Sequence, residues 1–238
     1  MNENHDETTR IVEALRELNP QRRKDRWGHL SLCILSATFS ISVSYDKVVA
    51  PLVRRYATHA GLSSVLLSGD ALKPPVSPRS DEQTLSQFLA SIEDLDDEAF
   101  AEVLDSRHRT STKSGILKSA AVRQIAQILV EKHGIETLAD FAELSADPER
   151  TSAVEGDLEA VKGAGQDGIR TGYIWMTAGD DERVKPDRHV LRWLSTCLGR
   201  RVNVAEAHVL LRDSAEALRV TPWSADHAIW EYQARPPK

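Results

Sequence analysis

The sequence predicts an all-α protein, and three observations support that fold class. Apolar residues recur at helical spacing along most of the 238-residue chain, whereas no segment shows the apolar–polar alternation of a convincing strand. Prolines, glycines and short polar turns separate the periodic segments. The hydrophobic fraction of 41 % and the charged fraction of 28 % are ordinary for a globular protein with a substantial core.

The expected helices follow one another along the whole chain. The first carries one apolar stripe and stops at Asn19-Pro20, and the second is apolar on nearly every side, which predicts a central position in a bundle. A proline-rich loop at 68–80 and a basic polar loop at 105–115 interrupt the series. The expected helices are 7–18, 27–38, 46–60, two short segments within 81–104, 116–133, 136–145, a short helix before Gly163, 166–178, 187–199, 204–218 and 221–232.

Charge is distributed unevenly along the chain. The net charge of −6 by itself argues against nucleic-acid binding. Residues 81–105, however, hold nine acidic and no basic side chains, and the next stretch turns basic at Arg107, Arg109, Lys113, Lys118 and Arg123. One interpretation is a basic surface that faces DNA, and the other is two solvated helix faces of opposite sign.

A glycine turn precedes the segment 166–178. Gly163 and Gly165 bracket Ala164, and both glycines are free to adopt positive φ. The helix that follows begins with several main-chain N–H groups pointing the same way, and the helix dipole adds to their attraction for an anion. The turn is therefore a candidate phosphate-binding site, although a glycine pair before a helix also occurs as an ordinary turn.

A carboxylate follows shortly after that helix. Pro186 suits the first position of a helix, and Asp187 suits the first turn, where the helix dipole favours an ionised carboxylate. An aspartate in such a position serves as a helix cap or as a catalyst, and the local sequence leaves both roles open.

The order and spacing of these features resemble the helix-hairpin-helix DNA glycosylase superfamily, which includes endonuclease III and the alkyladenine and 8-oxoguanine glycosylases. Val161-Lys162-Gly163-Ala164-Gly165 matches the family's Leu-Pro-Gly-Val-Gly, and Pro186-Asp187-Arg188-His189-Val190 matches its Val-Asp-Thr-His-Val. Leu35-Ser36-Ala37-Thr38, followed by Asp46, matches its Leu-Ser-Ala-Gln and later Asp, with Thr38 in place of glutamine. The resemblance covers most of residues 26–200.

The resemblance implies two helical lobes. One lobe of about six helices would span 26–180 and end in the hairpin at about 156–178. The other would combine the terminal segments 1–25 and 181–238.

The resemblance also implies a DNA glycosylase, a hydrolase of base excision repair that breaks the N-glycosidic bond of a flipped base. Asp187 would be its catalytic carboxylate. Members with lyase activity carry a lysine two residues after the second glycine, but this position is Asp167 here, so base release without strand cleavage is expected. The alternative is a catalytically inactive helix-hairpin-helix protein that binds DNA.

Further site residues are assigned by the same resemblance. Phe39 is a candidate wedge in the duplex, with core packing as its alternative role, and the lysines among the DNA contacts have solvation as theirs. Tyr45 and Trp27 are candidates for the base pocket. The expected DNA contacts are Gly163, Gly165, Gln166, Gly168, Lys113, Lys118, Thr38 and Phe39.

No cofactor is expected. The only cysteines, Cys33 and Cys197, cannot supply the four thiolates of an iron–sulfur cluster, and the histidines lack zinc-ligand spacing. The resemblance leaves room for a monovalent cation at the hairpin. The expected partner is double-stranded DNA containing a modified base, bound by a monomer. Since no apolar run approaches membrane-spanning length and the polar N-terminus is no signal peptide, no membrane association and a cytoplasmic location are expected.

Overall fold

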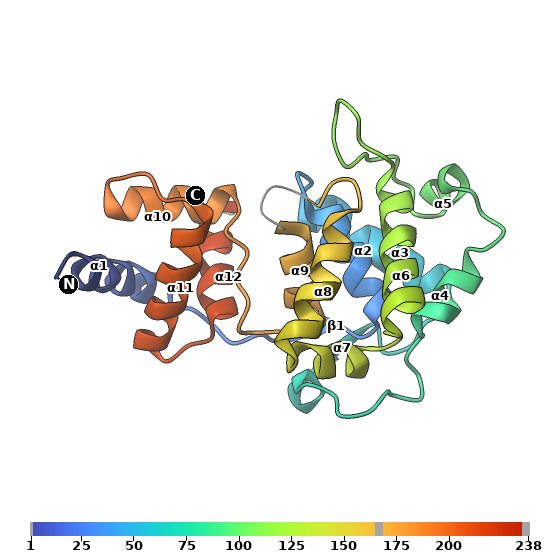
Figure 1. Cartoon of the computed structure of the whole chain (residues 1–238), viewed down its shortest axis with the longest axis horizontal. Helices are drawn as coiled ribbons and strands as arrows, with labels where there is room; N and C mark the ends of the chain where they lie inside the picture. Colours follow the sequence, from blue (N-terminus) through green and yellow to red (C-terminus); the bar gives the residue numbers. More distant parts are fainter. Residues whose placement is uncertain (1, 165–168, 235–238) are drawn as a thin grey trace. The chain divides into compact units, whose positions relative to one another are not determined.

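The computed structural model describes residues 2–164 and 169–234 and confirms an all-α fold (Figure 1). Besides the helices, the described residues form two short antiparallel strands, β1 (Asp25–Trp27) and β2 (Leu66–Ser68), in which Arg26 lies opposite Leu67. A π-helical turn, η1, spans Tyr45–Val49, and a 3-10 turn, η2, spans Gly69–Leu72. None of the described helices has the length and apolar character needed to span a membrane.

Helices occur from one end of the described residues to the other, with longer loops before α4 and α6. Their bounds are α1 Asn2–Leu18, α2 Leu30–Ser40, α3 Ala50–His59, α4 Leu85–Ser91, α5 Asp97–Val103, α6 Lys118–His133, α7 Leu138–Ser145, α8 Pro148–Glu159, α9 Ile169–Ala178, α10 Arg188–Leu198, α11 Val204–Leu218 and α12 Pro222–Ala234.

Contacts divide the chain into two compact units. Unit 1 comprises the described parts of Met1–Lys24 and Asp180–Lys238, and unit 2 comprises those of Asp25–Gly179. Unit 1 contains α1, α10, α11 and α12 around one apolar core, to which α1 contributes Ile11 and Leu15. Unit 2 contains the strands and the remaining helices.

Helix α2 lies at the centre of unit 2, as its apolar sequence predicts. Residues 30–39 are all buried, and the helix packs against α3, α6 and α9. It begins at Leu30, later than the expected Trp27, because Trp27 pairs with Leu66 in the small sheet. His29 therefore takes the N-cap position in extended geometry.

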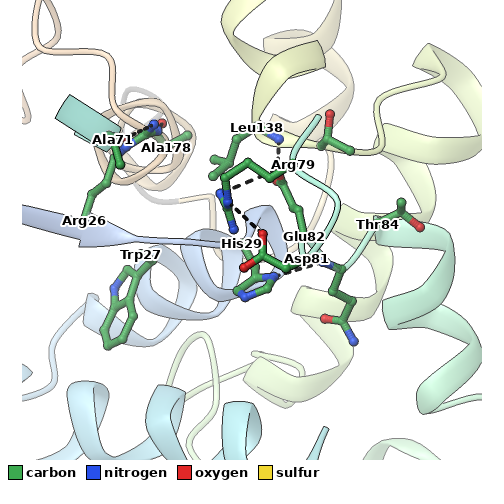
Figure 2. Close-up of polar contacts among 12 residues, drawn as sticks. Arg26, Trp27, His29, Ala71, Arg79, Asp81, Glu82, Thr84, Leu138 and Ala178 are labelled. Atoms are coloured by element: carbon green, nitrogen blue, oxygen red, sulfur yellow. Dashed lines mark hydrogen bonds and ion pairs between the residues drawn. The ribbon is translucent and has the colours of Figure 1, made fainter. Parts of the chain in front are cut away.

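Buried hydrogen bonds attach the segment 60–84, which lies between α3 and α4, to this core (Figure 2). The Gln83 main-chain N–H donates to His29 Nδ1 at 2.9 Å, so His29 carries its proton on Nε2 and donates to the Ser63 carbonyl at 2.7 Å. Burial lowers the pKa of His29, which favours this neutral form. Nearby, the buried Glu82 accepts from the Leu138 main-chain N–H at 2.7 Å.

Basic side chains, from buried Arg26 to exposed Arg55, close the C-terminal ends of helices in unit 2. Carbonyl groups in the last turn of a helix have no partner within the helix, and cations are favoured there by the helix dipole. Arg26 donates to the Ala178 carbonyl of α9 at 2.6 Å, and Arg123 donates to the Ile92 carbonyl after α4 at 3.0 Å. Arg55 donates to the Leu104 carbonyl after α5 at 2.8 Å.

Arg170 performs the same task at the hairpin formed by α8 and α9. Its guanidinium is fully buried and donates to the carbonyls of Leu158, Val161 and Lys162 at 2.8, 3.0 and 3.1 Å. Burial lowers the pKa of Arg170 to about 10, so the side chain stays charged at neutral pH. The start of α9 is thereby fastened to the end of α8.

The turn between these two helices contains Gly163, at a position that no other residue type could occupy without strain. Gly163 has φ of 88°, and a Cβ at this position would overlap the Thr110 side chain. Thr110 belongs to the 106–117 loop, which is closed by the Thr110 main-chain bond to the Ile116 carbonyl at 2.9 Å and the Lys118 bond to the His108 carbonyl at 2.8 Å. The glycine turn and this loop are therefore packed together.

We predict that Gly163→Ala destabilises the protein by about 2–4 kcal/mol, because it combines left-handed strain with overpacking against Thr110. Gly172→Ala is the matched control: Gly172 lies inside α9 with no atom in the way of a Cβ, so this variant should gain about 0.5–1 kcal/mol. Urea unfolding followed by circular dichroism measures both changes. Equal stability of the two variants would contradict the close packing of the turn.

Candidate functional site

Asp187 of unit 1 caps helix α10 at its N-terminus. Its Oδ1 accepts from the main-chain N–H groups of His189 at 2.8 Å and Val190 at 3.3 Å. Its Oδ2 lies 3.4 Å from the Lys185 ammonium, and the Asp187 side chain is 19 % exposed. One carboxylate oxygen is thus fixed by the backbone, while the other belongs to a partly exposed ion pair.

A second carboxyl group lies one contact further along. The main-chain N–H of Lys185 donates to Oδ2 of Asp226 at 2.6 Å. Asp226 is in α12 and is 3 % exposed, and burial raises its pKa to about 7. Sequence reasoning missed this residue because it matches no motif. The available signal was an aspartate among the apolar residues Ala225, Ala228 and Ile229 of one helix.

His189 follows the cap without joining it through its ring. Its Nδ1 is buried and has no hydrogen-bond partner among the described residues, and burial lowers the pKa of the ring. The contact with Asp187 is made by the His189 main chain. The ring is therefore available as a neutral donor or acceptor beside α10.

The glycine turn of unit 2 is described only in part. Gly163 has the left-handed conformation expected for such a turn, and the neighbouring Lys162 is exposed. The expected DNA contacts Gly165, Gln166 and Gly168 lie outside the described residues.

The 106–117 loop packed on Gly163 carries several cations. Arg107 is engaged by Glu98 at 2.7 Å and Glu102 at 2.8 Å, and Arg109 donates to the Gly115 carbonyl at 2.9 Å. Lys113 is exposed and makes no hydrogen bond or ion pair within the described residues. Of the basic residues expected at a DNA surface, Lys113 is the most available and Arg109 is the next.

Lys118 is not available to a phosphate, which corrects the expectation from sequence. It is 3 % exposed, and its ammonium donates to the carbonyls of Phe39 at 3.1 Å and Ile41 at 2.7 Å. Burial lowers its pKa to about 8. Lys118 closes the C-terminal end of α2.

Thr38 and Phe39 are also wrongly assigned to the DNA surface. Both lie on α2 and are buried in the core of unit 2, with 1 % and 0 % exposure. A buried side chain cannot wedge a duplex without unpacking the core. Core packing, the alternative role of Phe39, is the one the structure supports.

The base-pocket candidates Trp27 and Tyr45 are packed against the same core. Trp27 is buried in β1, and the half-buried Tyr45 starts η1. Burial raises the pKa of Tyr45. Their expected role in base recognition stays a prediction.

A surface depression of roughly 520 Å³ lies beside the basic loop and is lined by parts of η1, α3 and residues 105–108. It contains Lys47 and Arg55, but Arg55 pairs with Asp105 at 3.2 Å. Since Arg107 is also paired with acidic side chains, the depression has mixed charge and is no clear anion site.

The described residues hold no group of three or more His, Cys, Asp or Glu that could bind a metal ion. Cys33 is buried, and its thiol donates to the Thr177 carbonyl at 3.3 Å. Cys197 is half-buried, and burial raises the pKa of its thiol.

Comparison with known proteins identifies a family but no activity. No curated protein and no solved structure matches the chain. One family model matches residues 6–234, which covers nearly the whole chain and both of its units. The chain therefore belongs to the family described as "Domain of unknown function (DUF8548)".

Proposed function

We propose that the protein is a monofunctional DNA glycosylase that hydrolyses the N-glycosidic bond of a damaged or modified base turned out of double-stranded DNA. It would act as a cytoplasmic monomer without a cofactor. The observation that carries the proposal is the geometry of the Asp187 carboxylate. Its Oδ1 accepts from two main-chain N–H groups, and its Oδ2 points towards the Lys185 ammonium.

The chemistry of base release asks for such a group. Breaking an N-glycosidic bond leaves positive charge on the deoxyribose, and a fixed carboxylate stabilises that charge and orients the attacking water. The cap holds the Asp187 side chain in one rotamer before any substrate binds, so little ordering is required at the moment of reaction. Lys185, at 3.4 Å, weakens the field of the carboxylate in the resting protein.

A second feature, in unit 2, is proposed to bind the DNA backbone on its own account. It is the glycine turn at Gly163. The exposed Lys113 and Lys162 add positive charge around that turn. The overall charge of −6 does not oppose this assignment, because nine acidic residues are concentrated in 81–105.

The proposed reaction uses water as its nucleophile. A glycosylase that also cleaves the strand forms a Schiff base through an amine. The residue two positions beyond Gly165 is Asp167, which has no amine, so no covalent intermediate with the sugar is expected.

We predict that Asp187→Asn lowers base release by at least about 100-fold, because an amide caps a helix nearly as well but cannot stabilise a cationic sugar. Asp147→Asn is the matched control, since Asp147 caps α8 with the same two bonds, to the N–H groups of Glu149 and Arg150 at 3.1 Å. Single-turnover base release from duplexes with alkylated purines, oxidised guanine or uracil measures the effect.

The control should retain the parent's rate. If the parent released no base from any duplex of this panel while still binding DNA, the protein would be the catalytically inactive DNA-binding alternative. If Asp187→Asn and Asp147→Asn behaved alike, Asp187 would be a cap and no more.

We predict that Lys113→Ala weakens binding to any duplex and reduces the slope of log Kd against log salt by about 1, as expected for one lost phosphate contact. Lys132→Ala is the control. The loop leads into the start of α6, whereas Lys132 lies in the last turn of that helix and pairs with Asp157 at 2.7 Å. Fluorescence anisotropy between 50 and 200 mM salt provides the slopes. An unchanged slope for Lys113→Ala would remove this loop from the proposed DNA surface.

A further inference from the structure

The buried carboxyl group of Asp226 has no part in the proposed reaction, yet it is linked to Asp187 through a chain of short contacts. Its Oδ2 accepts from the Lys185 main-chain N–H at 2.6 Å. The Lys185 carbonyl in turn accepts from the Asp187 main-chain N–H at 2.6 Å. The Lys185 ammonium then returns to Oδ2 of Asp187 at 3.4 Å. Lys185 is thus held between two carboxyl groups, through its main chain on one side and its side chain on the other.

We propose that Asp226 is a positioning residue for Asp187: through the Lys185 main chain it fixes the turn that carries the Asp187 carboxylate, and through its charge it controls how fully Lys185 neutralises that carboxylate. The chemical meaning of this inference rests on the proposed glycosylase function. The contacts that carry it do not.

The position of Asp226 favours such control. It lies on α12, which packs against α1, α10 and α11. The core of unit 1, to which α1 and α11 contribute the buried Ile11, Leu15 and Leu211, is apolar. The charged groups that act on Asp226 are Lys185, which lowers its pKa, and Asp187, which raises it, and both effects are smaller than that of burial.

Protonation of Asp226 changes the charge around Asp187. In the neutral form of Asp226, one ammonium faces one carboxylate, and their charges cancel. In the ionised form, the Asp226 carboxylate at the Lys185 main-chain N–H adds a second negative charge, and a net negative charge remains around Lys185. That charge stabilises a cationic sugar better, so base release should become faster as Asp226 loses its proton, at a pH of about 7.

The first test is the pH profile of base release by the full chain. We expect the parent rate to rise about threefold to tenfold between pH 6 and pH 8 around a midpoint near 7. Asp226→Asn keeps an oxygen for the Lys185 N–H but cannot ionise, so its profile should stay flat at the low-pH rate of the parent. A purely structural role would lower the rate equally at every pH and leave the step in place, which would overturn the inference.

Asp213→Asn is the control for this test. Asp213 is a partly exposed aspartate of α11 in the same unit, paired with Arg212 at 3.7 Å. Its variant should keep the midpoint and the height of the parent's step. Loss of the step in this control as well would overturn the assignment to Asp226.

The second test needs no substrate and separates this inference from the proposed function. Carbon-13 NMR of the full chain should show an aspartate carboxyl that titrates near pH 7 and is missing in Asp226→Asn. The amide signals of His189 and Val190, which report on the Asp187 cap, should shift at the same midpoint in the parent only. Titration of Asp226 near its ordinary value of 3.8, or cap amides that ignore it, would overturn the inference even in an active enzyme.

The pH dependence of the protein's stability provides a third test. Since the pKa of Asp226 is raised in the folded state, its contribution to stability is fully present below pH 3.8 and is lost as pH rises towards about 7. The urea midpoint of the parent should therefore fall across this range relative to that of Asp226→Asn. A parallel course of the two curves would show that Asp226 ionises normally and would overturn the inference.

Discussion

The structure of unit 2 depends on basic side chains, three of them buried, that satisfy the carbonyl groups at helix ends. Five helices are closed in this way by a side chain distant in sequence: Lys118 on α2, Arg123 after α4, Arg55 after α5, Arg170 on α8 and Arg26 on α9. Each bond gives a partner to a carbonyl that the helix itself leaves without one. Removing a buried member, Lys118, Arg26 or Arg170, would leave both a cavity and unpaired acceptors.

This use of cations explains where charge analysis of the sequence went wrong. Lys118 and Arg123 belong to the basic stretch expected at a DNA surface, yet both donate into helix ends, and Arg107 is neutralised by Glu98 and Glu102. The sequence does not distinguish a lysine that caps a buried helix from an exposed lysine that binds a phosphate. Their roles differ only through burial, which depends on contacts far along the chain.

Local physics was enough for most helices. The apolar run of α2 predicted its central place. The Pro186-Asp187 pair predicted a helix start close to that of α10, but the helix begins at Arg188, so Asp187 is the N-cap and Pro186 precedes the helix. The pairing of β1 with β2 was missed, because three residues per strand are too few to show alternation. The sequence could not predict the contact of Thr110 with Gly163 or the bond from Lys185 to Asp226. Like the burial of Lys118, both depend on contacts between residues far apart in the chain.

Cap and catalyst are often treated as competing explanations of an aspartate at a helix start, but under the proposed function one geometry would serve both. The bonds from His189 and Val190 stabilise α10 and, by occupying Oδ1 alone, also fix the direction of Oδ2. Asp147 makes the same kind of cap at the start of α8, whereas Asp187 also pairs with Lys185, whose main chain binds the buried Asp226. What distinguishes Asp187 is therefore its surroundings. Asp226 accepts from the Lys185 main chain at 2.6 Å and so steadies the turn before the cap in either role. Under the proposed function its charge would in addition set the field of the Asp187 carboxylate before a cation forms beside it.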